Sequence, residues 1–265
     1  MSAWRWGINI GDLGSDPKRT IPIVASLGFS GIEFGAMSGD LEARGLSGSG
    51  RRHLRHFVES HGLTILSLTA DTSDLRWTDP RAVGERVERT GHVVDLARSL
   101  SVRLVSAKVA ALTHPESGEP SPVALEVLSR LGELSDSRGV TFALRPSNEK
   151  AECMARVLDA VRCPSLGLAL DPAALIMSGI NPLTYLARLV SQLSIVCVRD
   201  GTVGGPDRPG QEVRLGVGDV DWEGIVAVLE AAEFSGVLIC RRESSLLSSS
   251  EARTFREQVA TWRQR

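Results

Sequence analysis

Aromatic residues are scarce in this sequence. Phe, Trp and Tyr together make up 5% of its 265 residues, and Tyr occurs once. Proteins that bind single-stranded nucleic acid stack the bases on aromatic side chains, so such a platform is not expected here. The 30 Lys and Arg residues are balanced by 32 Asp and Glu residues, which gives a formal net charge of −2. Without a basic excess, we expect neither nucleic acid nor an anionic membrane as a partner.

Metal-binding cysteine pairs and long apolar runs are also missing. No two of the four cysteines form a CxxC motif; they are Cys153, Cys163, Cys197 and Cys240. We interpret them as reduced, mostly buried thiols. No apolar stretch approaches the roughly 18 residues of a membrane span. The opening MSAWRWGINIGDLG also lacks the apolar core of a signal peptide. We therefore expect a soluble, cytoplasmic protein.

What the sequence does contain is a regular alternation of short apolar runs with longer amphipathic segments. Most of the runs are apolar at consecutive positions, as in parallel strands that are covered on both faces. There are eight of them, at residues 6–10, 31–34, 64–69, 103–107, 140–144, 166–170, 194–198 and 237–240. Eight strand–helix units in this length predict a single-domain (β/α)8 TIM barrel over residues 1–265.

Several helix starts can be read directly from the sequence. A capping side chain followed by proline is typical of a first helical turn. The pairs of this kind are Asp16-Pro17, Asp79-Pro80, Ser121-Pro122 and Asn181-Pro182. Asp221-Trp222 opens a further predicted helix, and the last one is expected at about residues 249–262.

A doubly wound open sheet is the structural alternative to a barrel. Such a sheet usually carries a phosphate-binding GxGxxG after its first strand, and residues 11–14, GDLG, lack that spacing. We interpret the glycine-rich residues 45–50, GLSGSG, as a flexible loop that precedes a helix. The longest irregular stretch, residues 200–220, follows the seventh strand, where barrel enzymes build their sites, and is expected to be a lid or a binding loop.

Three stretches together resemble one protein family. They are GFSGIEF at residues 28–34, LGLALDPAALIMSGINP at residues 166–182, and RLGVGDVDWEGIVAVLEAAEFSGVLI at residues 214–239. They resemble the second strand, the sixth strand and the L-G-x-G-x-V-D-W signature of the xylose isomerase-like TIM barrels. These are sugar phosphate isomerases and epimerases related to endonuclease IV. Asp221 also has a local explanation as a helix cap, so the signature supports the fold more than the chemistry.

The resemblance implies one divalent metal ion (Mn, Mg or Zn) at the carboxyl end of the barrel. Its ligands would be Glu, Asp, His and Glu at the ends of strands five to eight, and the two glutamates would move protons. The corresponding residues of this chain are Arg145, Asp171, Cys197 and Arg241. With a neutral thiol these positions carry a charge of +1, which repels a divalent cation, and arginine cannot lose its proton. We therefore expect no metal and no other cofactor.

The residues at these strand ends suit a different ligand. In residues 139–149, GVTFALRPSNE, an apolar strand runs directly into Arg145. Arginine binds phosphate and carboxylate groups through two parallel hydrogen bonds. The residues expected to contact a ligand at the mouth of the barrel are Arg145, Arg241, Arg199, Lys108, Glu33 and Asn9. Our leading hypothesis is a divergent sugar phosphate isomerase/epimerase-like protein that binds a small anionic or polyol ligand of sugar type.

Whether such a protein turns its ligand over is left open by the sequence. The candidates for proton transfer without a metal are Asp171, Cys197 and His114, which follows the fourth strand on the same side of the barrel. A positioned partner is not evident for any of them. If active, the protein would be an isomerase or epimerase acting on a carbohydrate or a carbohydrate derivative.

Two alternatives stay open at this point. A two-residue slip keeps a side chain on the same face of a strand. An active metal-dependent isomerase or epimerase could therefore use shifted ligands, namely Asp171, Glu149, Glu243 and Cys197. In the other alternative, Arg145 and Arg241 pair with Asp171, Glu33 or Glu243 in an inert network, and the chain is a non-catalytic structural or interaction protein. A homo-oligomer is compatible with each interpretation.

Overall fold

A computed structural model describes residues 4–72, 74–205 and 208–262. Within these residues, eight parallel strands close into a barrel in the order β1-β10-β7-β6-β5-β4-β3-β2. They are β1 (Arg5–Asn9), β2 (Gly31–Gly35), β3 (Thr64–Thr69), β4 (Leu104–Val109), β5 (Thr141–Pro146), β6 (Leu166–Leu170), β7 (Leu193–Val198) and β10 (Val237–Cys240). The barrel prediction is confirmed, and each predicted strand forms within two residues of its expected ends.

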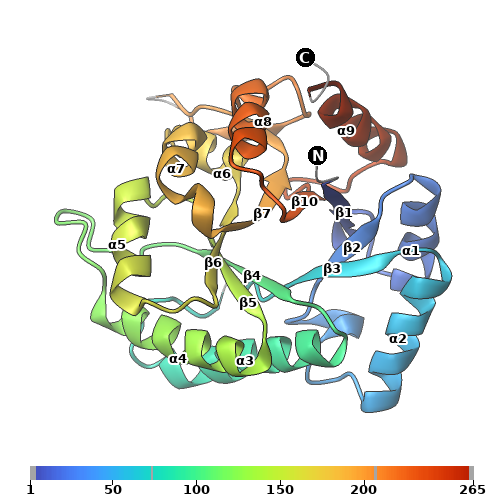
Figure 1. Cartoon of the computed structure of the whole chain (residues 1–265), viewed down its shortest axis with the longest axis horizontal. Coiled ribbons are helices and arrows are strands. Elements are labelled where there is room, and N and C mark those ends of the chain that lie inside the picture. Colours follow the sequence, from blue (N-terminus) through green and yellow to red (C-terminus); the bar gives the residue numbers. More distant parts are fainter. Residues whose placement is uncertain (1–3, 73, 206–207, 263–265) are drawn as a thin grey trace.

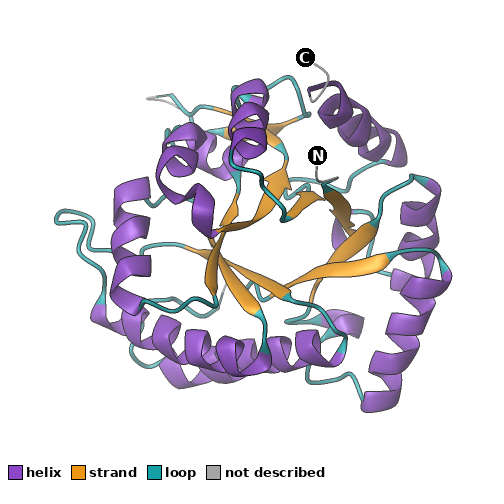
Figure 2. Cartoon of the chain, viewed as in Figure 1, coloured by secondary structure: helices purple, strands orange, loops and turns teal. Residues whose placement is uncertain are grey.

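Helices surround the closed sheet on its outside (Figures 1 and 2). They are α1 (Pro17–Ser26), α2 (Gly48–Ser60), α3 (Val83–Ser99), α4 (Pro122–Arg138), α5 (Ala151–Val161), α6 (Pro172–Met177), α7 (Pro182–Leu189), α8 (Trp222–Ala231) and α9 (Ser249–Trp262). Short 3-10 turns lie at η1 (Ile10–Asp12), η2 (Gly39–Leu41) and η3 (Val190–Gln192). Over the described ranges, every helix is too short or too polar to cross a membrane.

Four of the predicted helix caps are confirmed. The side chains of Asp16, Ser121, Asn181 and Asp221 each accept a hydrogen bond from a backbone N–H of the first helical turn. The first three are followed by proline at the first helical position, where a missing N–H costs nothing. These local signals fix where α1, α4, α7 and α8 begin, and therefore where the preceding loops end.

Two local predictions are wrong. Asp79 does not cap α3, which begins four residues later; its carboxylate instead accepts the N–H of Arg81 at 2.9 Å and closes a turn of its own. The glycine-rich residues 45–50 are only partly a loop, because Ser47 caps α2 and residues 48–50 form its first turn. In both cases a side chain that bonds the nearby backbone decides the structure.

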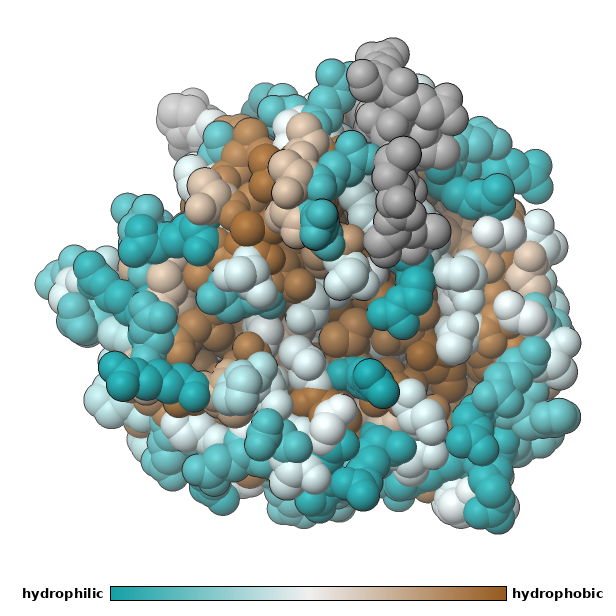
Figure 3. All heavy atoms as spheres, in the orientation of Figure 1, coloured by the Kyte–Doolittle hydropathy of each residue, from teal (hydrophilic) through white to brown (hydrophobic). Residues whose placement is uncertain are grey.

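The interior of the barrel changes from apolar to charged along the strands. Near the amino ends lies an apolar layer of buried side chains, made of Leu66, Ala143, Ala169, Ile195, Val237 and Ile239. Cys197 lies level with Ile239, at the side of this layer that is nearer the carboxyl ends, and the next inward positions are Arg199 and Arg241. Alternation along the strands therefore delivers charged side chains to the carboxyl end. On the outer face shown in Figure 3, hydrophilic residues dominate the rim formed by the helices.

Close packing in the barrel predicts that Gly31 in β2 tolerates no side chain. A Cβ at this position would lie 2.7 Å from Cγ of Leu66 and would press against the carbonyl oxygen of Thr64. Gly31→Ala should therefore lower the free energy of unfolding by about 1–3 kcal/mol. Chemical denaturation measures it. Gly84→Ala in α3 is the control, because a Cβ there meets nothing within 4 Å. An unchanged stability for Gly31→Ala would contradict the packing described here.

Candidate functional site at the carboxyl end of the barrel

Three arginines and one aspartate come together where the strands end. Arg145 lies in β5 beside Lys108 of β4. Asp171 directly follows β6 and Arg199 directly follows β7. Arg241 follows β10, and its N–H donates to the carbonyl oxygen of Val198 at 3.3 Å. The strand ends therefore lie where the sequence predicts them, and the four side chains share the mouth of the barrel.

Arg145 is the centre of the ionic network. Its side chain is 1% exposed. It forms an ion pair with Asp71, which follows β3, and its Nη1 lies 3.0 Å from Oε1 of Glu243 and 3.6 Å from Oδ2 of Asp171. Three carboxylates therefore converge on one buried guanidinium, which is how a buried charge is tolerated.

Arg199 holds Asp171 from the other side. Its Nε lies 2.9 and 3.1 Å from the two carboxylate oxygens of Asp171, and its Nη1 lies 3.1 Å from Glu212 of β9 (Gln211–Val213). Asp171 also accepts the N–H of Ala174 and so caps α6. Burial raises the pKa of Asp171, but the charges of Arg199 and Arg145 outweigh it and lower that pKa overall. Asp171 is therefore an ionised, fully engaged carboxylate.

Arg241 pairs with Glu33 of β2. Its Nε lies 2.8 Å from Oε1 of Glu33. The same carboxylate accepts hydrogen bonds from Nδ2 of Asn9 at 3.1 Å and from Oγ of Ser67 at 2.7 Å. Asn9 and Glu33, both predicted to contact a ligand, are thus occupied with each other and with Arg241.

Lys108 and Glu243 form the exposed end of the network. Nζ of Lys108 lies 3.1 Å from Oε2 of Glu243, and their side chains are 45% and 35% exposed. Burial raises the pKa of Glu243, but the charges of Arg199, Arg145 and Lys108 lower it to about 2. The two side chains therefore present an ammonium and a carboxylate to solvent at neutral pH.

The network as a whole is not positively charged. Within the described residues it contains four cationic side chains and five carboxylates: Arg145, Arg199, Arg241, Lys108, Glu33, Asp71, Asp171, Glu212 and Glu243. The charge of +1 for the four strand-end positions leaves out two further cations and four further carboxylates of the network: Arg199, Lys108, Glu33, Asp71, Glu212 and Glu243. The pairing of Arg145 with Asp171 and Glu243, and of Arg241 with Glu33, is confirmed. A basic mouth is not what the structure shows.

The other two predicted proton-transfer residues lie apart from the mouth surface. Cys197 is buried under the arginines, and burial, followed by the charge of Asp171, raises the pKa of its thiol to about 12. It is therefore a neutral thiol at physiological pH. His114 is exposed in the loop of residues 111–120, which projects past α5 at the left of Figure 1. In the described part of the chain, its hydrogen bonds stay within this loop.

The shifted set of metal ligands is not brought together. Glu149 accepts the N–H of Leu112 and the hydroxyl of Thr113, so it ties the loop after β4 to the start of α5. Its carbonyl accepts the hydroxyl of Tyr185. Across residues 4–72, 74–205 and 208–262, no three His, Cys, Asp or Glu side chains converge as metal ligands would.

The long segment after β7 has more structure than its sequence suggests. Residues 200–220 were expected to be irregular, but β8 (Asp200–Thr202) pairs with β9 in an antiparallel hairpin. The carboxylate of Asp200 accepts the N–H groups of Gly201, Gly216, Gly218 and Val220 and so fixes the base of the segment. The hairpin positions Glu212 so that its carboxylate accepts a hydrogen bond from Arg199.

An open cavity of about 640 Å³ lies against the network. Its lining consists of polar and charged side chains with two glycines: Asn9, Gly11, Asp12, Gly35, Thr69, Asp71, Thr72, Lys108, Arg241, Arg242 and Glu243. Hydroxyl, amide, ammonium and carboxylate groups therefore face the same space. This cavity is the candidate binding site.

Asp12 and its pKa were not anticipated from the sequence. It is partly buried in η1, where Oδ2 accepts the N–H of Arg242 at 2.8 Å. Its carbonyl oxygen accepts the N–H of Leu247 at 2.6 Å. Burial raises the pKa of Asp12 to about 7, the charge of Arg241 only partly offsets this, and Glu33 and Glu243 add to the rise. Asp12 therefore titrates near neutrality, unlike the carboxylates of the network.

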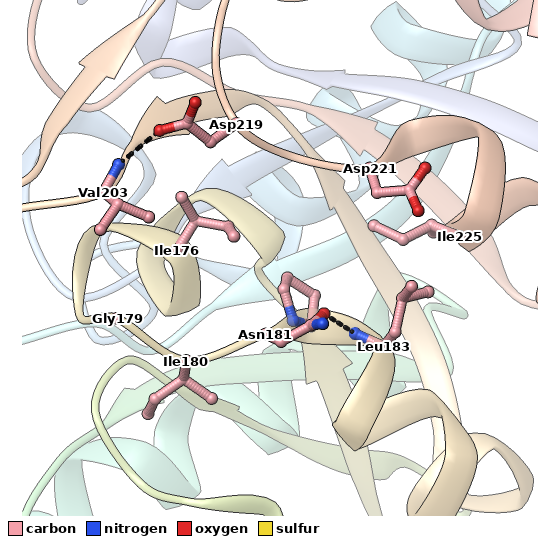
Figure 4. Close-up of a pocket in the computed structure, with 10 residues that line it drawn as sticks. Ile176, Gly179, Ile180, Asn181, Leu183, Val203, Asp219, Asp221 and Ile225 are labelled. Carbon is pink, nitrogen blue, oxygen red and sulfur yellow. Dashed lines mark hydrogen bonds between the residues drawn. The ribbon is translucent and has the colours of Figure 1, made fainter.

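A second hollow, of about 240 Å³, lies outside the barrel among α6, α7 and α8 (Figure 4). Its polar side chains serve the local backbone. Asp219 accepts the N–H of Val203, Asn181 accepts that of Leu183, and Asp221 caps α8. The remaining lining is largely apolar, so this hollow offers no group for chemistry.

Comparison with known proteins identifies the family. A family model described as xylose isomerase-like TIM barrel matches residues 21–265. The chain belongs to this family. A comparison with curated proteins finds no significant match.

Solved structures with the same fold cover nearly the whole chain. The xylose isomerase domain protein from Planctomyces limnophilus is 16% identical with a TM-score of 0.83, over 100% of this chain and 98% of that one. A D-tagatose 3-epimerase-like protein is 16% identical with a TM-score of 0.80, over 98% and 97%. The 3-keto-D-glucoside 4-epimerase of E. coli is 14% identical with a TM-score of 0.72, over 99% and 100%. At these identities the likeness shows a shared fold.

Removal of the central guanidinium should have two measurable effects. Arg145→Ala leaves Asp71, Asp171 and Glu243 facing one another without their shared cation, which should cost about 3–5 kcal/mol of unfolding free energy in EDTA. Because these carboxylates then surround an open space, millimolar Mn²⁺ should restore part of the lost thermal stability. Arg81→Ala is the control, since that side chain is 89% exposed and should change stability by less than about 0.5 kcal/mol. An Arg145→Ala protein as stable as the wild type in EDTA would refute the network's role.

The raised pKa of Asp12 predicts how its replacement depends on pH. The folded state resists ionisation of this carboxyl between its ordinary value of 3.8 and about 7, so the wild type loses stability as pH rises through that range. Asp12→Asn removes this loss and keeps an acceptor for the N–H of Arg242. The variant should gain about 1–3 kcal/mol at pH 8, with the gain shrinking towards pH 4. Denaturation curves from pH 4 to 8 measure the stability difference between the variant and the wild type. A gain that does not vary with pH would contradict the raised pKa of Asp12.

Proposed function

We propose that this chain binds a small carbohydrate-type ligand in the mouth cavity and that it does so without a resident divalent metal. One observation carries the proposal above all. A guanidinium group, that of Arg145, lies among Asp71, Asp171 and Glu243, the carboxylates that gather at the mouth. A cation built into the chain thus takes the central place, while the polar cavity beside it stays open.

The residues of the mouth do not fit a divalent cation. Asp171, the aspartate kept at the end of β6, has both oxygens engaged by Arg199 and also accepts the N–H of Ala174. A metal next to it would lie close to two buried guanidinium groups, and like charges about 4 Å apart repel by about 4 kcal/mol at an effective dielectric constant of 20. The proposed function therefore includes no step that depends on a metal ion.

The chemistry of the cavity favours a polyhydroxylated ligand. Thr69 and Thr72 offer hydroxyl groups to the space, Lys108 offers an ammonium group, and Asp71 and Glu243 offer carboxylates. Such a lining suits the many hydroxyl groups of a sugar, each of which both donates and accepts.

The charge of the mouth limits which sugars fit. The network carries a formal excess of one carboxylate, so it repels a multiply charged anion such as a sugar bisphosphate. A neutral sugar, or one with a single negative charge held by Lys108, fits better. Two of the structural neighbours are described as a sugar epimerase and an epimerase-like protein, which supports the same substrate class.

Ligand stabilisation tests this function. Thermal unfolding of the full chain should be measured with D-fructose, D-tagatose, D-gluconate and D-fructose 6-phosphate, in EDTA and in MnCl2. At least one sugar should stabilise the protein in EDTA, by about 2.7 kcal/mol at a hundredfold excess over its Kd. Lys108→Met should weaken that binding at least about tenfold, since it removes an ammonium from the cavity.

Lys18→Met is the matched control, because it makes the same change at an exposed residue of α1 and should leave binding unaltered. If no sugar stabilises the protein under either condition, the binding function is wrong and a non-catalytic role in protein interaction takes its place. If binding requires Mn²⁺, a metal-dependent isomerase or epimerase is the better interpretation.

A further inference from the structure

The cavity presents two carboxyl groups in contrasting surroundings. Glu243 is within 3.5 Å of Arg145, Arg199 and Lys108, so its negative charge is heavily compensated. Asp12 lines the same cavity, but its hydrogen bond comes from a backbone N–H, that of Arg242. Within the described residues, Oδ1 of Asp12 has no hydrogen-bond donor. A carboxyl group with a free oxygen in a polar cavity is free to exchange a proton with a ligand.

From this geometry we propose that Asp12 is a catalytic base and acid of the mouth, acting on a hydroxyl-bearing carbon next to the carbonyl group of a bound 2-ketose. The inference rests on the proposed function, because it requires a sugar in the cavity. It adds a reaction, an enolisation without a metal, and a residue that performs it.

The reaction balances with the groups present. The carboxylate of Asp12 takes the proton from the carbon, the C–H electron pair forms a carbon–carbon double bond, and the carbonyl oxygen becomes an enediolate oxygen. Return of the proton to the same carbon restores the ketose. Return to the former carbonyl carbon, with transfer of the hydroxyl proton to the former carbonyl oxygen, gives the isomeric aldose when the proton came from C1 and the isomeric 3-ketose when it came from C3. No oxidant, reductant or further reactant is consumed.

The charge that develops on oxygen has one cationic partner in the same cavity. Lys108 lines the space, and its side chain is 45% exposed, so its ammonium group can contact a ligand there. A cation next to a developing oxyanion lowers the barrier to enolisation, because it favours the intermediate more than the neutral ketose.

The other carboxylates of the mouth are poor bases by comparison. Salt bridges lower the pKa of Asp71, Asp171 and Glu243, so these groups bind a proton weakly at neutral pH. Besides burial, which opposes ionisation of Asp12, the groups that act on it are Arg241 and the backbone N–H of Arg242, which favour its ionised form, and Glu33 and Glu243, which oppose it. A base that titrates near 7 takes up and returns a proton at neutral pH more readily than one that titrates near 2.

Deuterium exchange in heavy water tests the inference. The full chain, in EDTA, is incubated in deuterium oxide with D-fructose and with D-tagatose, and proton NMR follows the signals of the hydrogens on the carbons next to the ketone. The wild type should catalyse their replacement by deuterium. The rate should rise with pH until about 7 and then level off as Asp12 becomes ionised. Asp12→Asn should slow exchange at least about a hundredfold.

Asp40→Asn is the matched control, since it makes the same change at an exposed carboxyl and should stay within about twofold of the wild type. Thermal unfolding verifies that Asp12→Asn is folded. Binding of a ketose without exchange overturns the inference and leaves the proposed function standing. Exchange by Asp12→Asn at the wild-type rate also overturns it. If neither ketose binds or exchanges, the inference fails, and the binding panel above decides the proposed function separately.

Discussion

The buried arginines at the mouth of the barrel constrain the rest of this site. Arg145, Arg199 and Arg241 are each 1–5% exposed, and none of them can become neutral to escape burial. Each must therefore be matched by carboxylates at contact distance, and a missing partner would leave an uncompensated charge in a poorly solvated place. This requirement explains why loops after β3 and β10 and the β8–β9 hairpin all send acidic side chains inward.

The barrel itself sets where those arginines lie. Residues two apart on a strand point to the same side, so Ile239 and Arg241 enter the same interior space at successive levels. The apolar layer below excludes water and supports the strands, while the next layers are free to carry polar groups. Cys197 occupies the boundary between the two, which accounts for its neutral thiol. The apolar layer and the candidate site thus lie toward opposite ends of one sheet.

The sequence predicts the fold and the strand-end residues well because their signals are local and periodic. The positions of Arg145, Asp171 and Arg241 follow from strand lengths alone. Asp71 and Glu212 could not be predicted in the same way, because their loops carry no periodic pattern and meet the arginines only after the barrel closes. The sum of charges over the strand ends was misleading for the same reason.

Asp12 shows how an ionic network can leave the pKa of a neighbouring carboxyl group raised. The arginines and their carboxylates satisfy one another, so little positive charge is left to stabilise a further anion nearby. A carboxyl group placed at the edge of this network is partly desolvated, is repelled by Glu33 and Glu243, and is only partly compensated by Arg241. Its proton affinity rises as a consequence. The interactions that place a guanidinium at the centre of the mouth therefore also leave the neighbouring carboxyl of Asp12 with a raised pKa.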